Sequence, residues 1–118
     1  MNIMKYIIDE KKTQDMTNEE FAAKLPFSRQ RFEQIVKQPD CQFRLVRAML
    51  KALGKDIDIR KPHGSAADID TPKMLEEMDA ANVFFVQQKA IIEGAGLAFY
   101  IVNAGASYGV QSDMDLRI

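Results

Sequence analysis

The chain has few of the residues on which disulfides and zinc sites depend. Cysteine and histidine each occur once in 118 residues, at Cys41 and His63. One cysteine permits no internal disulfide, which suits a reducing cytosol. A lone histidine without a cysteine cluster argues against a zinc site. We therefore expect a cytoplasmic protein that carries no metal and no other cofactor.

Long apolar runs and catalytic motifs are also missing. The longest weakly polar run, 95–102, is far too short to span a bilayer. Residues 1–10 mix charged with apolar residues, so a secretory leader is not expected. No glycine-rich phosphate loop, nucleophile elbow or metalloprotease motif is present. Glu76 and Glu77 are more typical of a solvated helix face than of an acid/base pair. Because long apolar runs and catalytic motifs are both missing, we expect neither a membrane protein nor an enzyme.

Charge is distributed unevenly, although the net charge is only −1. Residues 1–62 carry 13 Lys and Arg against 9 Asp and Glu, whereas residues 63–118 carry 3 against 8. The excess is sharpest between Lys24 and Lys51, where 7 residues are basic and 2 are acidic. A basic first half is compatible with binding a polyanion such as nucleic acid. The alternative explanation of the uneven charge is that the two halves have surfaces that differ only in solvation.

Two short helices are expected before residue 26. Apolar residues at helical spacing predict the first helix over 2–12. Thr17 and Glu20 then form a capping box, in which the threonine accepts from the amide three residues on and the glutamate reaches back. Phe21 begins the buried stripe of the second helix. The proline at 26 ends this helix, because its ring disfavours helical backbone at the residue before it.

Two further helices and a strand are expected next. Ser28 is a suitable N-cap for a third helix over 29–37, with a separate apolar inward face. Asp40 can cap a fourth helix, and Gly54 follows it as a C′ residue. Polar and apolar residues then alternate with the period of a short strand, which we place at 56–60.

The second half of the chain is expected to be helical. Proline, glycine, serine and alanine make 61–71 a linker. Thr71-Pro72 has the form of an N-cap followed by proline, and the helix that it begins is predicted to run to residue 93. The apolar residues of this helix occupy much of its circumference, so other parts of the protein must cover it on more than one side. Periodicity does not decide between helix and strand for 97–104, and 105–118 has the composition of a flexible tail.

One stretch has the order of two helices joined by a tight turn. It reads NEEFAAKL at 18–25 and FSRQRFEQI at 27–35, and the next helix ends in ALG at 52–54. This pattern resembles the Cro/repressor-type helix-turn-helix family, also described as xenobiotic-response-element-like or lambda repressor-like. Ala22 stands at the family's small-residue position, where the two helices cross. The resemblance covers about residues 1–60.

The resemblance implies a mainly α fold. We expect a lambda repressor-like helix-turn-helix domain at 1–60, a linker at 61–71, a helical oligomerisation segment at 72–104 and a flexible tail at 105–118. The family usually has glycine where Pro26 stands. Because proline cannot adopt the positive φ that glycine supplies, this turn must have another shape.

The resemblance places the third helix in the major groove of DNA. There, Gln30 can pair with adenine, and Arg29 or Arg31 can pair with guanine. The predicted DNA-binding residues are Ser28, Arg29, Gln30, Arg31, Gln34, Lys37, Lys24 and Arg44. The two lysines of this set and Arg44 are predicted to contact phosphates.

The leading hypothesis is therefore a sequence-specific transcriptional regulator, repressor- or antitoxin-like, that binds double-stranded DNA as a homodimer. The alternative is a protein–protein interaction module that keeps the helix-turn-helix scaffold without reading DNA. Pro26 and the acidic second half motivate this alternative. Oligomer contacts are predicted for apolar residues of the second half: Met78, Phe84, Phe85, Ile91, Ile92, Phe99 and Tyr100. These side chains can instead pack back on the N-terminal domain of the same chain.

Overall fold

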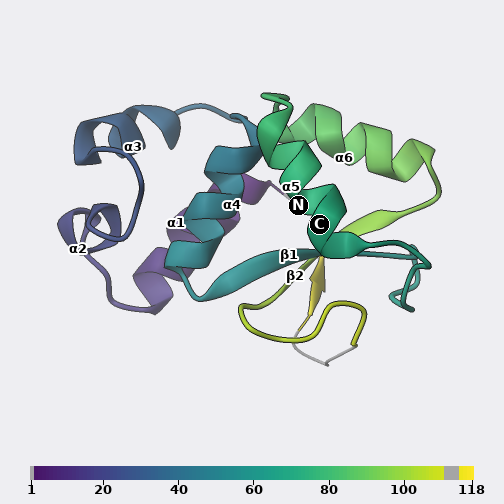
Figure 1. Ribbon diagram of the computed structural model, residues 1–118. Helices are drawn as coiled ribbons and strands as arrows, with labels where there is room; N and C mark the ends of the chain where they lie inside the picture. The colour runs from purple at the N-terminus through teal and green to yellow at the C-terminus, as the bar shows by residue number, and fades with distance from the viewer. Residues whose placement is uncertain (1, 111–114) are drawn as a thin grey trace.

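The fold is mixed α and β, so the expectation of a mainly α fold is wrong. The computed structural model describes residues 2–110 and 115–118, which form six helices and a three-stranded antiparallel sheet (Figure 1). In chain order the elements are α1 (Ile3–Thr13), α2 (Asn18–Ala22), α3 (Arg29–Ile35), α4 (Phe43–Ala52), β1 (Lys55–Arg60), α5 (Thr71–Ala80), α6 (Phe85–Gly94), β2 (Ala98–Asn103) and β3 (Leu116–Arg117).

The sheet has β2 at its centre, between β1 and β3. Strand β1 is antiparallel to β2, with Ile57 opposite Ile101. The strand predicted at 56–60 is confirmed, one residue longer at its start. The undecided segment 97–104 forms β2, because the backbone groups of an isolated strand need a partner strand to be hydrogen-bonded. This pairing is the physical reason for the mixed fold.

The two faces of the sheet are covered by different parts of the chain. The face toward the helices carries apolar residues of both long strands, Ile57, Ile59, Phe99 and Ile101. The opposite face carries the charged residues of β1, namely Asp56, Asp58 and Arg60. Residues 104–110, which loop below the sheet in Figure 1, hydrogen-bond to this charged face.

The predicted caps of α2 and α3 are confirmed. Thr17 accepts from the Glu20 amide at 3.1 Å, and the Glu20 carboxylate accepts from the Thr17 amide. Ser28 caps α3 by accepting from the amide three residues on at 3.2 Å. Helix α3 ends at Ile35, two residues before its predicted end. Gly54 follows α4 with a φ of +73°, as predicted for a C′ residue.

Asp40 does not cap α4, contrary to the prediction. The N-cap of α4 is Gln42, whose side chain makes no capping bond. The Asp40 carboxylate instead accepts from the backbone amides of Cys41 at 2.9 Å and Val86 at 3.2 Å. Asp40 thereby ties the loop before α4 to the first turn of α6.

The single helix predicted over 71–93 is wrong, because the chain forms two helices, α5 and α6. The break at 81–84 contains Asn82, whose φ of +54° is left-handed and incompatible with a continuous right-handed helix. Asp70, rather than Thr71, is the N-cap of α5, and its side chain accepts from an amide in the first turn.

The break between α5 and α6 allows the chain to pair with the segment before α4. The Phe43 amide donates to the Val83 carbonyl, and the Phe85 amide donates to the Cys41 carbonyl, each at 2.8 Å. Phe85 then stacks on Phe43 and Phe99, with ring centroids 6.2 and 5.8 Å away. The three rings join α4, α6 and β2 in one core.

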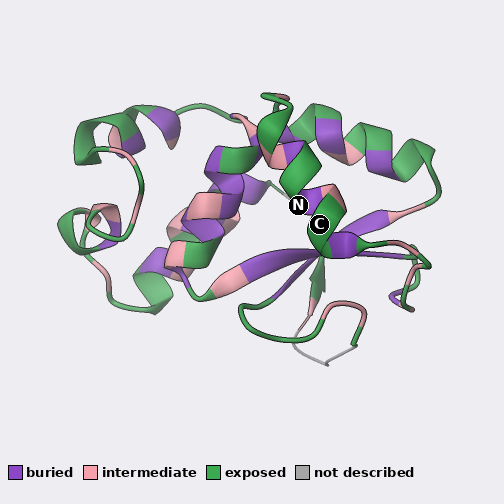
Figure 2. Cartoon of the chain, in the orientation of Figure 1, coloured by how far each residue is buried: buried purple, intermediate pink, exposed green. Residues whose placement is uncertain are grey.

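The hydrophobic core continues across the predicted linker at 61–71. One cluster of buried side chains includes residues of α1, α4 and β1 as well as residues of α5, α6 and β2 (Figure 2). Within the predicted tail, residues 115–118 contain strand β3, and the Asp115 side chain is only 8% exposed. Residues 111–114 lie outside the described residues.

Candidate nucleic-acid interface

Helices α2 and α3 pack together through an aromatic pair. Phe21 of α2 and Phe32 of α3 are buried, and their rings meet edge to face with centroids 5.0 Å apart. Leu25 and Phe27, on either side of the turn, are partly buried against the core. These contacts set the direction in which α3 presents its outward side.

The turn between α2 and α3 contains Pro26 and uses no left-handed residue. None of residues 23–28 has a positive φ. The amides of the two residues before the proline donate to carbonyls of α2 at 3.0 Å and so continue that helix as a tight turn. Proline suits this backbone, because its ring fixes φ near −65° and it needs no amide donor. The predicted departure from a glycine-type turn is confirmed.

All eight residues predicted to contact DNA are exposed. Six of them lie on α3 or next to it, while Lys24 lies in the turn and Arg44 on α4. Within the described part of the chain, Lys24, Arg31, Lys37 and Arg44 form no ion pair. The Arg44 Nε donates only to the Gln42 Oε1, at 3.0 Å. Four of the predicted cations are therefore available to an anionic ligand.

Arg29 differs from the other cations of this surface. Its Nε donates to the Glu33 Oε1 at 2.9 Å, one turn further along α3. This hydrogen bond from Arg29 lowers the pKa of Glu33, and a weaker bond from the Asn18 side chain at 3.5 Å acts in the same direction. The carboxylate of Glu33 thus sits on α3 among the predicted base-reading residues.

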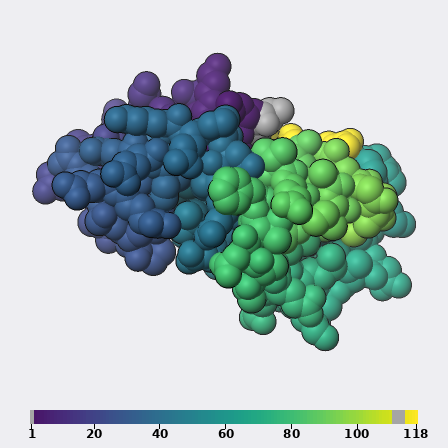
Figure 3. Space-filling view, turned by 90° about the horizontal axis from the view of Figure 1, so that it is seen from above, coloured from purple at the N-terminus to yellow at the C-terminus, as the bar shows by residue number. Residues whose placement is uncertain are grey.

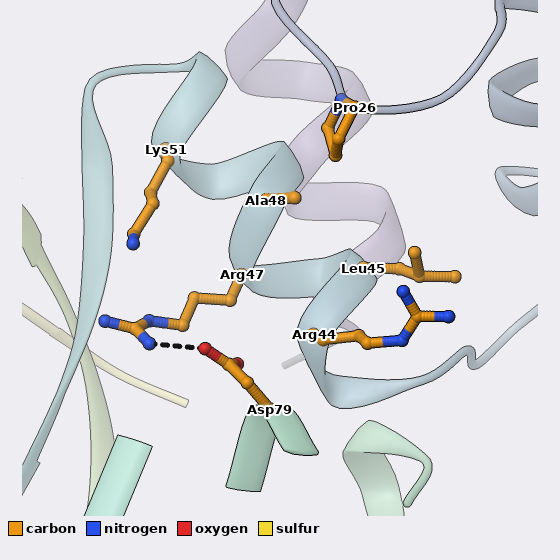
Figure 4. A pocket seen from close by; sticks show the side chains of 7 residues that line it. All are labelled: Pro26, Arg44, Leu45, Arg47, Ala48, Lys51 and Asp79. Carbon is orange, nitrogen blue, oxygen red and sulfur yellow. Dashed lines mark hydrogen bonds and ion pairs between the residues drawn. The ribbon is translucent and has the colours of Figure 1, made fainter. Parts of the chain in front are cut away.

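A basic groove, which sequence reasoning missed, lies between this turn and α4. One hollow of about 250 Å³ is lined by Pro26, Arg44, Leu45, Arg47, Ala48, Lys51 and Asp79 (Figure 4). The signal in the sequence was the recurrence of Arg44, Ala48 and Lys51 at i, i+4 and i+7, which places them on one face of α4. Lys51 is exposed and forms no ion pair among the described residues.

Arg47 is the one cation between 24 and 51 that is not available at the surface. It is 8% exposed, and its guanidinium contacts the carboxylates of Asp56 at 3.1 Å and Asp79 at 2.7 Å. Burial by itself would lower the pKa of Arg47, but the hydrogen bonds and charges of the two aspartates outweigh burial and raise it. The positive charge that the sequence placed here is therefore compensated within the fold.

A second buried set of charges lies on the face of β1 turned away from the helices. Arg60 is 2% exposed, and it contacts Asp58 and Asp115 at 2.7 Å each. Its remaining terminal nitrogen donates to the Val110 carbonyl at 2.8 Å, and its guanidinium lies 5.2 Å from the ring centroid of Tyr100. This charged face is covered by residues near the end of the chain, including Gly109, Val110 and Asp115.

The aspartates of β1 also occupy the free edge of the sheet. The Ala104 amide donates to the Gly54 carbonyl, so the even-numbered residues of β1 bond to β2 and the odd-numbered ones point to the free edge. The edge amides of Ile57 and Ile59 donate to the preceding aspartates at 2.7 and 2.8 Å. These carboxylates therefore accept hydrogen bonds from the amides at the free edge of the sheet, and they also take part in the ion pairs described above.

The residues predicted for oligomerisation divide into two groups. Five of them are buried in the core of the chain itself, namely Met78, Phe85, Ile92, Phe99 and Tyr100. Phe84 and Ile91 are 48% and 54% exposed. Val86, which was not predicted, is equally exposed on the same helix. Only Phe84 and Ile91 of the predicted set are thus positioned to contact a second chain.

The remaining candidate groups form no additional site. Cys41 is buried, and burial together with the charge of Asp40 raises the pKa of its thiol to about 11. The exposed His63 ring is hydrogen-bonded to Ser65. Among the described residues, no three His, Cys, Asp or Glu side chains gather as a metal site would require. None of the described helices combines the length and apolar character needed to cross a bilayer.

Comparisons with known proteins give no relative for this chain. No family model, curated protein or solved structure matches it.

Proposed function

We propose that the chain is a DNA-binding protein that acts as a transcriptional regulator of the repressor or antitoxin type. The observation that carries this proposal is a set of exposed cations on one unit of three helices. Each forms no ion pair with another described residue: Lys24, Arg31, Lys37, Arg44 and Lys51. Uncompensated cations gathered in this way attract the phosphate backbone of nucleic acid.

In this proposal α3 enters the major groove and its first residues meet the base edges. Gln30 would pair with adenine and Arg31 with guanine, since both side chains can make two parallel hydrogen bonds to one base. Arg29 would join them by leaving Glu33, because an exposed ion pair adds little to stability and is readily exchanged. Lys24 and Lys37 would contact phosphates and set the orientation of the helix.

A second copy of the chain would supply the other half-site. The outward side of α6 exposes Phe84, Val86 and Ile91. The charged residues Lys89 and Glu93 on this helix pair with each other at 2.6 Å, so the surface carries no net charge. An uncharged apolar surface can meet its own copy across a two-fold axis. Sedimentation should detect a dimer that Ile91→Asp converts to monomer.

Binding to duplex DNA tests the proposal directly. We expect a mixed-sequence duplex to bind at low salt, and a random pool to yield an enriched sequence after selection. Arg31→Gln should weaken binding to the selected sequence by about 1–3 kcal/mol, the usual contribution of a bidentate base contact. Lys73→Gln removes one exposed charge from α5 and should leave binding unchanged, which makes it the matched control.

Absence of duplex binding at low salt would reject the proposal. A stable protein partner whose binding survives Arg31→Gln, together with no DNA binding, would establish the interaction module instead. Duplex binding without any enriched sequence would keep the DNA contact and remove the assignment of base reading to Gln30 and Arg31.

A further inference from the structure

The groove beside Pro26 is longer than the hollow of Figure 4 alone. A second hollow of about 530 Å³ shares Pro26, Ala48 and Lys51 with the first. It continues along α4 and is lined by Lys24, Pro26, Ala48, Lys51, Ala52 and Gly54. Because the two hollows share Pro26, Ala48 and Lys51, we treat them as one open groove, here called the α4 groove, between the turn after α2 and the outer face of α4. Figure 4 shows the residues that line the first of the two hollows.

The charge of the α4 groove is strongly positive. Four cationic side chains line it, against the single carboxylate of Asp79. Arg47 and Asp79 pair with each other at 2.7 Å, so they largely neutralise one another at one end. One oxygen of Asp79 is buried and has no hydrogen-bond partner, which makes that end unfavourable for an anion. Among the described residues, no carboxylate pairs with the other three cations of the groove, Lys24, Arg44 and Lys51.

The spacing of these cations suits an extended ligand. Arg44 and Lys51 lie seven residues apart on α4, which corresponds to about 10 Å along the helix axis. The small residue Ala48 lies between them and Ala52 lies beyond Lys51, so a backbone can approach this part of α4 closely. An extended polyanion such as a chain of phosphates can contact both cations along the groove.

We infer that the α4 groove binds the phosphate backbone of duplex DNA while α3 is in the major groove. This inference rests on the proposed function and adds a second contact region to it. Pro26 forms the wall of the groove opposite α4. A proline there keeps the wall rigid and offers no amide that would need a partner of its own. The residue that replaces the family's glycine thus helps to shape a phosphate site.

The salt dependence of binding tests this inference. Each phosphate contact contributes about 0.9 to the slope of log K against log salt concentration. The double variant Arg44→Gln, Lys51→Gln should therefore bind a mixed-sequence duplex with a slope shallower by about 2. Its affinity should fall by the same factor on selected and unselected sequences, because phosphates carry no sequence information. The circular dichroism spectrum of this double variant should match that of the wild-type protein, since both side chains are exposed.

Ala48→Glu provides a second, independent variant. It places a carboxylate on the floor of the groove without touching α3, and we expect it to weaken duplex binding at least as much as the double variant does. Lys73→Gln should change neither slope nor affinity. Wild-type slopes in both groove variants would overturn the inference while leaving the proposed function intact. Absence of duplex binding by the wild-type protein would overturn both.

Discussion

Two arginines on one helix differ completely in their surroundings. Arg44 is exposed and has no carboxylate partner among the described residues, whereas Arg47, three residues later, is 8% exposed and held by two aspartates. Both contribute equally to the basic excess counted from the sequence. The difference shows that a count of charged residues overstates the positive charge available to a ligand, because ion pairs in the folded chain neutralise some of these charges.

The same contrast separates two regions of the molecule. The space-filling view shows α3 and α4 as one side of the surface, beside the side formed by α5 and α6 (Figure 3). Five exposed cations of the segment that contains α3 and α4 form no ion pair with another described residue, so they suit a ligand: Lys24, Arg31, Lys37, Arg44 and Lys51. The charges of Asp56, Asp58 and Arg60 on β1 are buried and form ion pairs, so they serve the fold. Each prediction below either breaks or sharpens this contrast.

The largest effect is expected for Asp58→Ala. The Asp58 side chain is fully buried and accepts from the Arg60 guanidinium and from the amides of Ile59 and Gly109. Removing it leaves a buried guanidinium with one carboxylate partner, which should cost about 3–5 kcal/mol of unfolding free energy in urea titrations. Glu76→Ala on the exposed side of α5 should change stability by less than about 0.5 kcal/mol. Similar values for the two variants would contradict the structural role assigned to β1.

Arg47→Met and Arg44→Met form a matched pair. Arg47→Met should lower the unfolding free energy by about 3 kcal/mol, at the low end for a buried pair because Asp79 is partly exposed. Arg44→Met should leave stability nearly unchanged and weaken duplex binding, since Arg44 has no structural partner of opposite charge. Urea titration and fluorescence anisotropy measure the two properties. Equal loss of stability in both variants would remove the contrast.

Cys41 extends the contrast to a group that titrates in the alkaline range. Its folded pKa of about 11 lies above the ordinary value of 9.0, because burial disfavours the thiolate. The folded state therefore holds the thiol proton more tightly than the unfolded state does. The contribution of the protonated thiol to the unfolding free energy is complete below pH 9 and is lost as pH rises through 11. Unfolding free energy should fall between these values by about 2–3 kcal/mol more in the wild type than in Cys41→Ala. Parallel pH profiles would contradict this.

The smallest effect on stability is expected for Glu33→Gln. The Arg29–Glu33 pair is exposed, so its loss should leave the urea midpoint unchanged. Duplex binding should tighten, because Arg29 is released and a negative charge is removed from the surface that we propose to face DNA. The salt slope should become steeper for the same reason. Weaker binding by this variant would show that Glu33 holds Arg29 in a productive position.

Local signals in the sequence predicted several helix ends in the first half of the chain, although the predicted cap of α4 at Asp40 was wrong. The capping box at Thr17, the cap at Ser28 and the C′ glycine at 54 act within a few residues, so they could be read without the fold. The exposure of the predicted DNA-binding residues followed from the same helix faces. The Arg44, Ala48 and Lys51 face was visible in the sequence, but the groove required Pro26 to be placed opposite it.

Long-range pairing decided what the sequence could not. Strand β2 exists because β1 pairs with it, and the paired residues Lys55 and Asn103 lie 48 positions apart in the sequence. The break before α6 depends on backbone hydrogen bonds such as the one that the Phe43 amide donates to the Val83 carbonyl, and sequence periodicity does not reveal such long-range bonds. The burial of Arg60 depends on Asp115, which is 55 residues away. None of these long-range pairings can be read from the composition of the chain.

The salt dependence of duplex binding by the wild-type protein tests the central claim most directly. If the four exposed cations that form no ion pair with another described residue and are not assigned to a base, Lys24, Lys37, Arg44 and Lys51, each contact a phosphate, the logarithm of the binding constant should fall linearly with the logarithm of salt concentration, with a slope of about −4. A titration over about 50 to 200 mM salt resolves such a slope. No binding at the lowest salt concentration, or a slope near zero, would contradict the account.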